Sequence, residues 1–188
     1  SIPYDAARDF VPVAMLSAGK VPLCIHKSVP GNDLAALVAY AKKNKTSFGT
    51  TGIGSLAHVF CMKLNDTFGI NMEPVHYRGE APMWADVMSQ SIDGAIGSYP
   101  AGLPVLQAKK AHAISSTSRP IRILPDLKTL PQQGATSTFF QLGGFSGLLA
   151  APAGTPMEIV KKLSDLMVAA GKDQKTQAAL ANFPIELP

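Results

Sequence analysis

The chain has 188 residues, of which 46% are hydrophobic and 16% charged, a composition typical of a folded globular protein with a buried core. The 17 basic and 13 acidic residues leave a small surplus, +4, and its densest cluster, Lys42, Lys43 and Lys45, is typical of a solvated helix end rather than of a nucleic-acid site. No run approaches the roughly eighteen apolar residues of a membrane helix, so we expect no membrane-embedded segment.

Short apolar runs alternate with helical patterns along most of the chain, separated by Gly, Pro or small polar residues. The expected strands are residues 11–16, 21–26, 47–50, 73–77, 92–97 and 111–116, and the expected helices begin near residues 34, 56, 82 and 103. Pro12 and Pro22 argue against central positions for the first two strands. Successive β-α-β units predict an α/β fold with a mostly parallel, open sheet and helices on its faces.

The pattern changes after Ser116. Residues 119–133 are predicted to form an irregular connection, residues 142–150 an extended segment, and residues 173–181 a last helix. Before that helix, Thr155 is a suitable N-cap and Pro156 a suitable first residue of another helix. The latter helix carries apolar residues on one face: Ile159, Val160, Leu163, Leu166 and Met167. Both ends would leave sheet edges bare, and we therefore interpret the chain as part of a longer protein.

The two cysteines give no sign of a metal site. Cys24 and Cys61 share no ligand spacing with each other or with the four histidines, and Cys61 lies in an apolar helical run typical of a core position. In an oxidising compartment, a disulfide between the two cysteines is an alternative that the sequence leaves undecided. We expect no metal and no cofactor.

The most informative loop is Thr50-Thr51-Gly52-Ile53-Gly54-Ser55, between a strand and a helix. Glycines let the backbone approach a ligand closely, and the N–H groups of a helix start favour an anion, to which the hydroxyls of Thr51 and Ser55 add donors. The loop lacks the lysine and the spacing of a P-loop and the third glycine of a dinucleotide fingerprint, so a carboxylate suits it better than a nucleotide. The alternative is a tight turn capped by Ser55.

Two further strand ends carry polar residues. Tyr77-Arg78-Gly79 can aim a guanidinium at a carboxylate, although an ordinary surface arginine fits the same pattern, and Gly97-Ser98 offers small donors. Because ligands of open α/β sheets bind beyond the carboxyl ends of the strands, these loops are expected at one edge. The candidate ligand-binding residues are Thr51, Gly52, Gly54, Ser55, His58, Tyr77, Arg78, Gly79 and Ser98.

Catalytic patterns are weak. Asp86 and Asp93 have no carboxylate partner in local register, and the serine of Gly52-Ile53-Gly54-Ser55 is misplaced for a nucleophile elbow. His58, His76 and His112 fit structural positions. We therefore expect a protein that is not an enzyme.

Five segments in order resemble a known family. Residues 4–13, 51–58, 75–82, 124–130 and 151–156 are similar to the motifs of the substrate-binding components of tripartite tricarboxylate transporters, the Bug family. Where many members carry an acidic or amide pair, this chain has Gly97-Ser98, and the opening strand and first ligand loop of the family have no counterpart here.

The resemblance implies a type II periplasmic-binding-protein fold, with two α/β lobes joined by crossing strands and the first lobe incomplete. Residues 1–15 would then belong to the first lobe and the hinge, residues 16–138 to the second lobe, and residues 139–188 to the hinge return strand and first-lobe helices. It also implies a periplasmic protein that captures a small carboxylate, such as a di- or tricarboxylate, an amino acid or an aromatic acid, and delivers it to inner-membrane permease subunits. A small-molecule enzyme on the same scaffold and a ligand-sensing module are the alternatives.

Overall fold

The computed structural model describes residues 3–19, 21–121, 123–141, 146–181 and 185–186. The chain divides into two compact units: unit 1 comprises residues 1–19 and 145–188, and unit 2 comprises residues 20–144. Both divisions fall slightly later along the chain than the expected 15/16 and 138/139.

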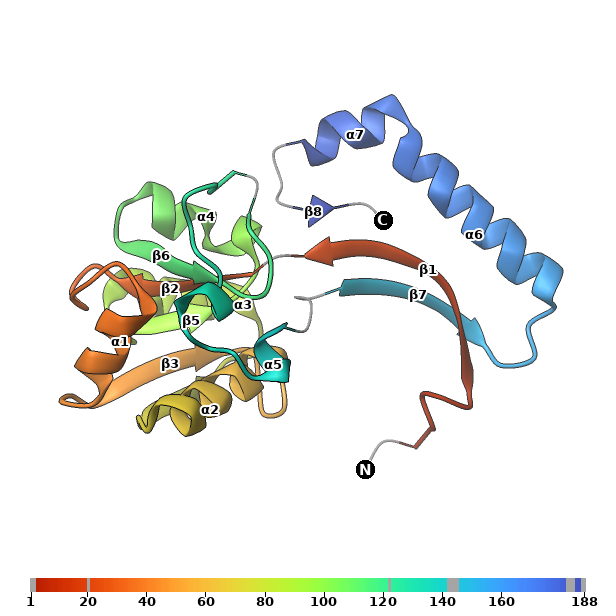
Figure 1. Ribbon diagram of the computed structural model, residues 1–188. Helices are drawn as coiled ribbons and strands as arrows, with labels where there is room; N and C mark the ends of the chain where they lie inside the picture. The colour runs from red at the N-terminus through yellow and green to blue at the C-terminus, as the bar shows by residue number, and fades with distance from the viewer. Residues whose placement is uncertain (1–2, 20, 122, 142–145, 182–184, 187–188) are drawn as a thin grey trace. The chain divides into compact units, whose positions relative to one another are not determined.

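Unit 2 alternates strands and helices, as predicted (Figure 1). Its elements are β2 (Pro22–His26), α1 (Leu34–Ala41), β3 (Thr46–Thr50), α2 (Leu56–Phe68), β4 (Met72–His76), α3 (Glu80–Ser89), β5 (Gly94–Ile96), α4 (Tyr99–Gln107), β6 (Ala111–Ser116), the 3-10 turn η1 (Pro131–Gln133) and α5 (Thr138–Gln141). Helix α4 begins at Tyr99 rather than at Leu103, since Pro100 lies in the first turn, where its missing N–H costs no hydrogen bond.

The sheet of unit 2 has the strand order β4-β3-β5-β2-β6. Strand β3 pairs in parallel with β4 and β5, whereas β2 pairs antiparallel with β5 and β6, so four strands run one way and β2 runs against them. The mostly parallel sheet is confirmed. The expectation that proline keeps β2 out of the sheet interior was wrong, because Pro22 is the first residue of the strand and its missing N–H interrupts no ladder.

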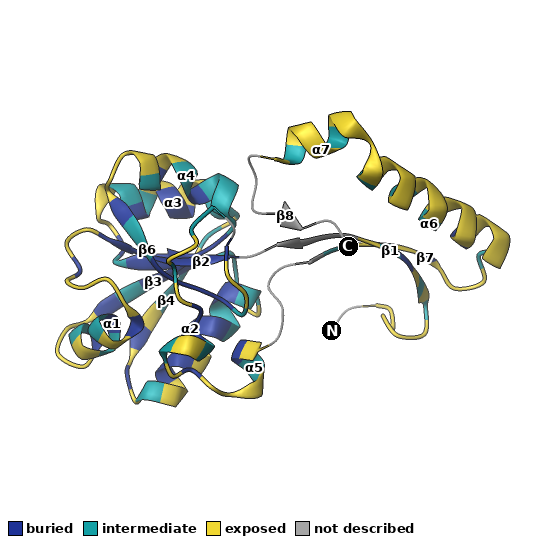
Figure 2. Ribbon diagram, turned by 45° about the horizontal axis from the view of Figure 1, so that its top comes forward, coloured by how far each residue is buried: buried dark blue, intermediate teal, exposed yellow. Residues whose placement is uncertain are grey.

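Helices cover both faces of this sheet. Leu23 and Ile25 of β2 pack with α1, α2 and α5, whereas Cys24 between them packs with α3 and α4. Figure 2 shows this buried interior in dark blue. Cys61 lies on the α2 side, so the two cysteines are on opposite faces, and both are free and buried. Burial raises the pKa of each thiol to about 12.

Unit 1 contains an antiparallel sheet of order β7-β1-β8, and its two helices lie between β7 and β8 along the chain. Its elements are β1 (Phe10–Gly19), β7 (Ser146–Pro152), α6 (Met157–Lys172), α7 (Gln174–Leu180) and β8 (Ile185–Glu186). The predicted extended segment 142–150 is a strand from Ser146, and residues 142–145 lie outside the described residues. Helix α6 begins one residue late, because Pro156 has an extended ψ of 133° and the Thr155 hydroxyl donates to the Pro152 carbonyl instead of capping.

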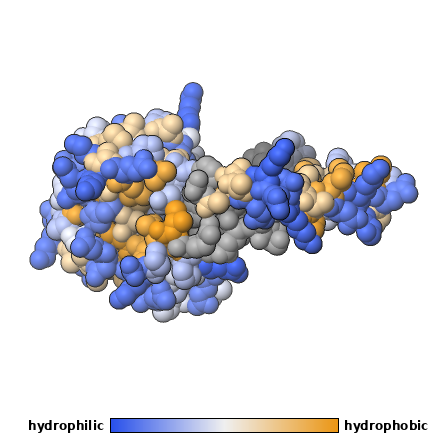
Figure 3. Space-filling model, turned by 90° about the horizontal axis from the view of Figure 1, so that it is seen from above, coloured by the Kyte–Doolittle hydropathy of each residue, from blue (hydrophilic) through white to orange (hydrophobic). Residues whose placement is uncertain are grey.

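The apolar face predicted for α6 exists but is largely uncovered. Val160 is the buried residue of this helix and packs with Val13 and Ala151, while Leu166 is 54% exposed. In Figure 2 the helix is mostly yellow, and in Figure 3 apolar and hydrophilic surface alternate over unit 1. None of the helices in the described ranges is long and apolar enough to cross a membrane.

Candidate functional site

The three predicted loops lie along one edge of the unit 2 sheet. Strands β3, β4 and β5 run in parallel, so their carboxyl ends, at Thr50, His76 and Ile96, share that edge. The Tyr77 N–H donates to the Thr50 carbonyl over 2.9 Å, and the Thr50 hydroxyl and His76 Nδ1 are hydrogen-bonded at 2.6 Å. These hydrogen bonds connect the ends of β3 and β4 within the protein itself.

The loop 51–55 is a tight turn that leads into α2. Gly52 and Gly54 have φ values of 131° and 78°, which residues with a Cβ rarely adopt, and the Ser55 N–H closes the turn on the Gly52 carbonyl at 3.1 Å. Ser55 is the N-cap, and its Oγ accepts the His58 N–H at 3.3 Å. The capped-turn interpretation is confirmed. It leaves the Ser55 hydroxyl proton available, because capping uses a lone pair of the oxygen.

His58 holds this loop from the first turns of α2. Its Nδ1 accepts the Gly54 N–H at 3.0 Å, which places the ring proton of the neutral imidazole on Nε2. The ring meets that of His76 edge to face, with 4.8 Å between centroids. His58 thus links the glycine loop to the end of β4.

Several donors at the start of α2 remain free. Within the described part of the chain, the N–H groups of Leu56 and Ala57 and the hydroxyl of Thr51 have no hydrogen-bond partner. They stand at the positive end of a helix of 13 residues. Free N–H groups at a helix start suit an anionic oxygen.

The second loop contributes a cation. Arg78 is exposed, and among the described residues it forms no ion pair with a carboxylate. The Tyr77 hydroxyl donates to Asp86 Oδ2 at 2.7 Å, and its burial, this bond and the Asp86 charge raise the pKa of Tyr77 to about 12. Gly79, with a φ of 116°, is the N-cap of α3. The Tyr77 hydroxyl is thus engaged by Asp86, whereas the Arg78 guanidinium is exposed.

The third loop differs from expectation in what its donors do. The Ser98 N–H donates to both carboxylate oxygens of Glu80, at 3.0 and 2.9 Å, and the Ser98 hydroxyl donates to Oε2 at 2.6 Å. A carboxylate of the chain itself thus occupies the corner where the sequence predicted free donors. Sequence reasoning missed Glu80 because 18 residues separate it from Ser98, and no local pattern signals such a contact.

A second feature absent from the sequence analysis lies at the end of β6. The hydroxyls of Ser116, Thr117 and Ser118 are buried and have no hydrogen-bond partner in the described chain, and the same holds for Trp84 Nε1. The run Ser-Ser-Thr-Ser was visible in the sequence, but its burial depends on the packing of residues 128–130 against β6, where Leu130 N–H donates to the Ser116 carbonyl at 2.8 Å.

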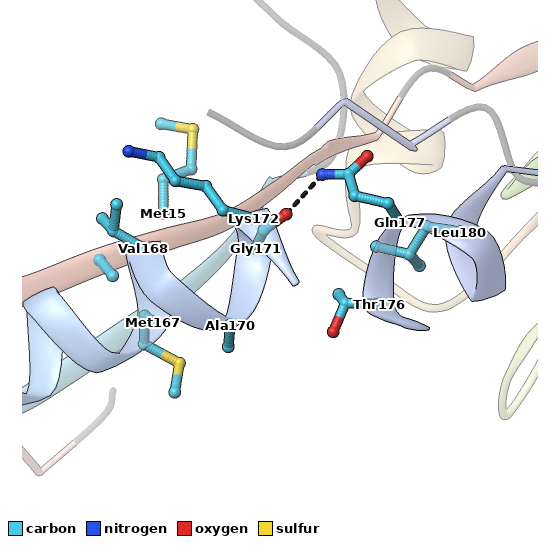
Figure 4. Close-up of a pocket in the computed structure, with 10 residues that line it drawn as sticks. Met15, Met167, Val168, Ala170, Gly171, Lys172, Thr176, Gln177 and Leu180 are labelled. Carbon is cyan, nitrogen blue, oxygen red and sulfur yellow. Dashed lines mark hydrogen bonds between the residues drawn. The ribbon is translucent and has the colours of Figure 1, made fainter. Parts of the chain in front are cut away.

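Unit 1 has a separate hollow of about 390 Å³ between β1 and the helices α6 and α7 (Figure 4). Met15, Met167 and Leu180 give it an aliphatic lining, and the Gln177 side-chain amide donates to the Gly171 carbonyl beside it. It contains none of the predicted ligand-binding residues. Across the described ranges, no group of three or more His, Cys, Asp or Glu side chains could hold a metal ion.

Comparisons with known proteins identify a family and related structures. The sequence pattern described as the tripartite tricarboxylate transporter family receptor matches residues 1–187. A curated protein of Agrobacterium vitis, "UPF0065 protein in the TAR-I ttuE-ttuC' intergenic region", is 30% identical over 98% of the chain and 54% of its own length. The chain therefore spans about half the length of this curated relative.

Two solved structures share the fold over the whole chain. Rpa4515 of R. palustris, solved with adipate, has a TM-score of 0.86 and 26% identity, and 62% of its length is covered. MatC (Rpa3494) from Rhodopseudomonas palustris, solved with bound malate, has a TM-score of 0.85 and 26% identity, with 64% covered. Each of these two proteins was thus solved with a small dicarboxylate.

Proposed function

Because the chain belongs to the tripartite tricarboxylate transporter receptor family, with the α/β fold of two-lobed periplasmic binding proteins, we propose that it captures a small carboxylate. The protein would work in the periplasm and deliver its ligand to inner-membrane permease subunits. It would hold the ligand without converting it. The adipate and malate bound by its structural relatives support this ligand class.

The observation that carries the proposal is the set of free donors at the start of α2. One ligand carboxylate would accept the N–H groups of Leu56 and Ala57 and the Ser55 hydroxyl, with Thr51 beside them. The positive φ of Gly52 and Gly54 favours glycine at both positions, and the space that a Cβ would enter there is open, so it is left to an approaching ligand. His58 would fix the loop.

Arg78 would supply the neutralising charge, while Tyr77 and Gly79 would shape its surroundings. A guanidinium binds a carboxylate through two parallel hydrogen bonds, which gives both affinity and orientation. Two aspartates that follow Arg78 in the sequence have structural partners: Asp86 accepts the Tyr77 hydroxyl, and Asp93 accepts the Ser47 N–H and hydroxyl at 2.8 and 2.9 Å. These contacts favour a binding role over acid–base catalysis.

Calorimetric titration of the full chain with di- and tricarboxylates, aromatic acids and amino acids tests the proposal. Arg78→Ala should lower the affinity for the ligand that binds best about 10- to 100-fold. Lys43→Ala is the matched control, because it removes an equal charge from the exposed connection that precedes the amino end of β3. If both variants bind like the parent chain, the assignment of the site is wrong.

A pair of variants at Ser55 separates capping from binding. Ser55→Asp keeps a good N-cap but removes the hydroxyl donor and adds a repelling charge, so stability should hold while binding is lost. Ser55→Ala should lose roughly 1 kcal/mol of stability and part of the affinity. Unchanged affinity in Ser55→Asp would contradict carboxylate binding at this loop.

A further inference from the structure

The Glu80 carboxylate occupies the start of α4. Glu80 is the first residue of α3, and its side chain reaches the end of the neighbouring strand β5, where both its oxygens accept donors of Ser98. Ser98 is the N-cap of α4 but makes no side-chain cap, and its hydroxyl donates to Glu80. At this edge of the sheet, the start of α4 is thus occupied by the Glu80 carboxylate of the chain itself.

The charge of Glu80 is not neutralised by a cation. In the ranges that the structure describes, no Lys, Arg or His forms an ion pair with it. Glu80 is half-buried, so part of it remains exposed to solvent. A carboxylate can accept about four hydrogen bonds, and Oε1 takes part in one contact, so accepting capacity remains.

The edge therefore has two unlike ends. The strand order β4-β3-β5 puts the free donors of the 51–55 loop and Arg78 at the ends of β3 and β4, and Glu80 at the end of β5. A carboxylate is favoured at the first position. At the second, another carboxylate would meet a like charge and find the Ser98 donors already used.

We propose that Glu80 selects the ligand by charge. The ligand class is a small acid with one carboxylate for the 51–55 loop and a hydrogen-bond-donating group, such as an ammonium, at its other end for Glu80. A second carboxylate is disfavoured. This inference rests on the proposed function and narrows its ligand class.

The experiment compares pairs of probes with equal chain length. The pairs are γ-aminobutyrate with succinate, 5-aminopentanoate with glutarate, and 6-aminohexanoate with adipate, each titrated calorimetrically into the full chain. For the length that binds best, the amino acid should bind about tenfold more tightly than the dicarboxylate, the size of one charge-assisted hydrogen bond. Glu80→Gln keeps an acceptor for Ser98 and should abolish this ratio.

Glu73→Gln is the matched control, because it removes the same charge from an exposed position of β4 and should leave the ratio unchanged. Glu80→Asp, which keeps the charge on a shorter side chain, should retain the sign of the preference. If the parent chain binds the dicarboxylates at least as well as the amino acids, or if Glu80→Gln leaves the ratio intact, the inference about Glu80 fails and the proposed function stands. If the chain binds none of these probes and no acid of the wider panel, the proposed function itself fails.

Discussion

The two units of the chain differ in how much of their apolar surface they bury. Unit 2 encloses its sheet between helices on both faces, whereas the described residues of unit 1 contribute Val13, Ala151 and Val160 to buried apolar surface. Both units have regular strands and helices with clear sequence signals. The difference teaches that a pattern can specify a helix and its apolar face without specifying what covers that face. Stability and site geometry should therefore reside in unit 2.

The sharpest way to break this comparison is to separate the units. Residues 20–144 produced alone should fold and unfold in one cooperative thermal transition, because both cores of unit 2 lie within that range. A chain in which a short glycine-serine linker replaces residues 20–144 should show no such transition. Circular dichroism against temperature measures both. A broad, non-cooperative melt of residues 20–144 would contradict the comparison.

Matched leucine substitutions in the two units test the difference in burial at single residues. Leu64 and Leu166 both lie in helices, but Leu64 is 0% and Leu166 54% exposed. Leu64→Ala should lower the free energy of unfolding by about 2–5 kcal/mol, whereas Leu166→Ala should change it by less than about 0.5 kcal/mol. Urea titration of the two variants provides the values. Equal losses would show that the α6 face is covered in solution.

The elements of both units could be predicted from local signals, and the burial of α6 could not. Alternation, helical spacing and the Ser55 cap are encoded within a few residues and recur in the structure, whereas the starts of α4 and α6 differ from those predicted. The reverse direction of β2 has no local signal, because a strand reads the same in either direction. Burial of a helix face depends on partners that lie elsewhere in the chain.

The candidate site follows the same rule. The glycine loop and Arg78 could be proposed from the sequence, because the glycines, hydroxyls and charge of each loop are adjacent in the chain. The contacts that determine which donors are free could not, since Glu80 meets Ser98 and Tyr77 meets Asp86 only after α3 has packed beside β5. The buried hydroxyls after β6 were missed for a related reason: a serine-rich run is typical of an exposed loop, and tertiary packing buried it here.

A pH titration distinguishes the units by their ionisable groups. Cys24 and Cys61 are both in unit 2, and burial raises the pKa of each thiol from 9.0 to about 12. An unfolded thiol loses its proton near pH 9, while the folded one keeps it. The contribution of each thiol to the free energy of unfolding is therefore complete below about pH 9 and declines as the pH rises toward about 12.

The expected loss at pH 10 is about 1.4 kcal/mol for each thiol, the value of one pH unit. Urea unfolding at pH 8 and pH 10 measures it. The double variant Cys24→Ala, Cys61→Ala should be less stable at pH 8 but show a shallower decline with pH. A decline as steep as that of the parent chain would exclude the thiols as its source.

The smallest predicted effect concerns two neighbouring hydroxyls of unit 2. The Thr117 hydroxyl is buried and without a partner among the described residues, whereas the Ser115 hydroxyl donates to the carbonyls of Ser116 and Lys128 at 3.0 and 3.1 Å. Thr117→Val should be neutral or stabilise by up to about 1 kcal/mol, because it removes a desolvated polar group, while Ser115→Ala should destabilise by a similar amount. Thermal unfolding compares the two. If Thr117→Val costs as much as Ser115→Ala, the hydroxyl has a partner in solution, and a buried water at the end of β6 would then be part of the unit 2 core.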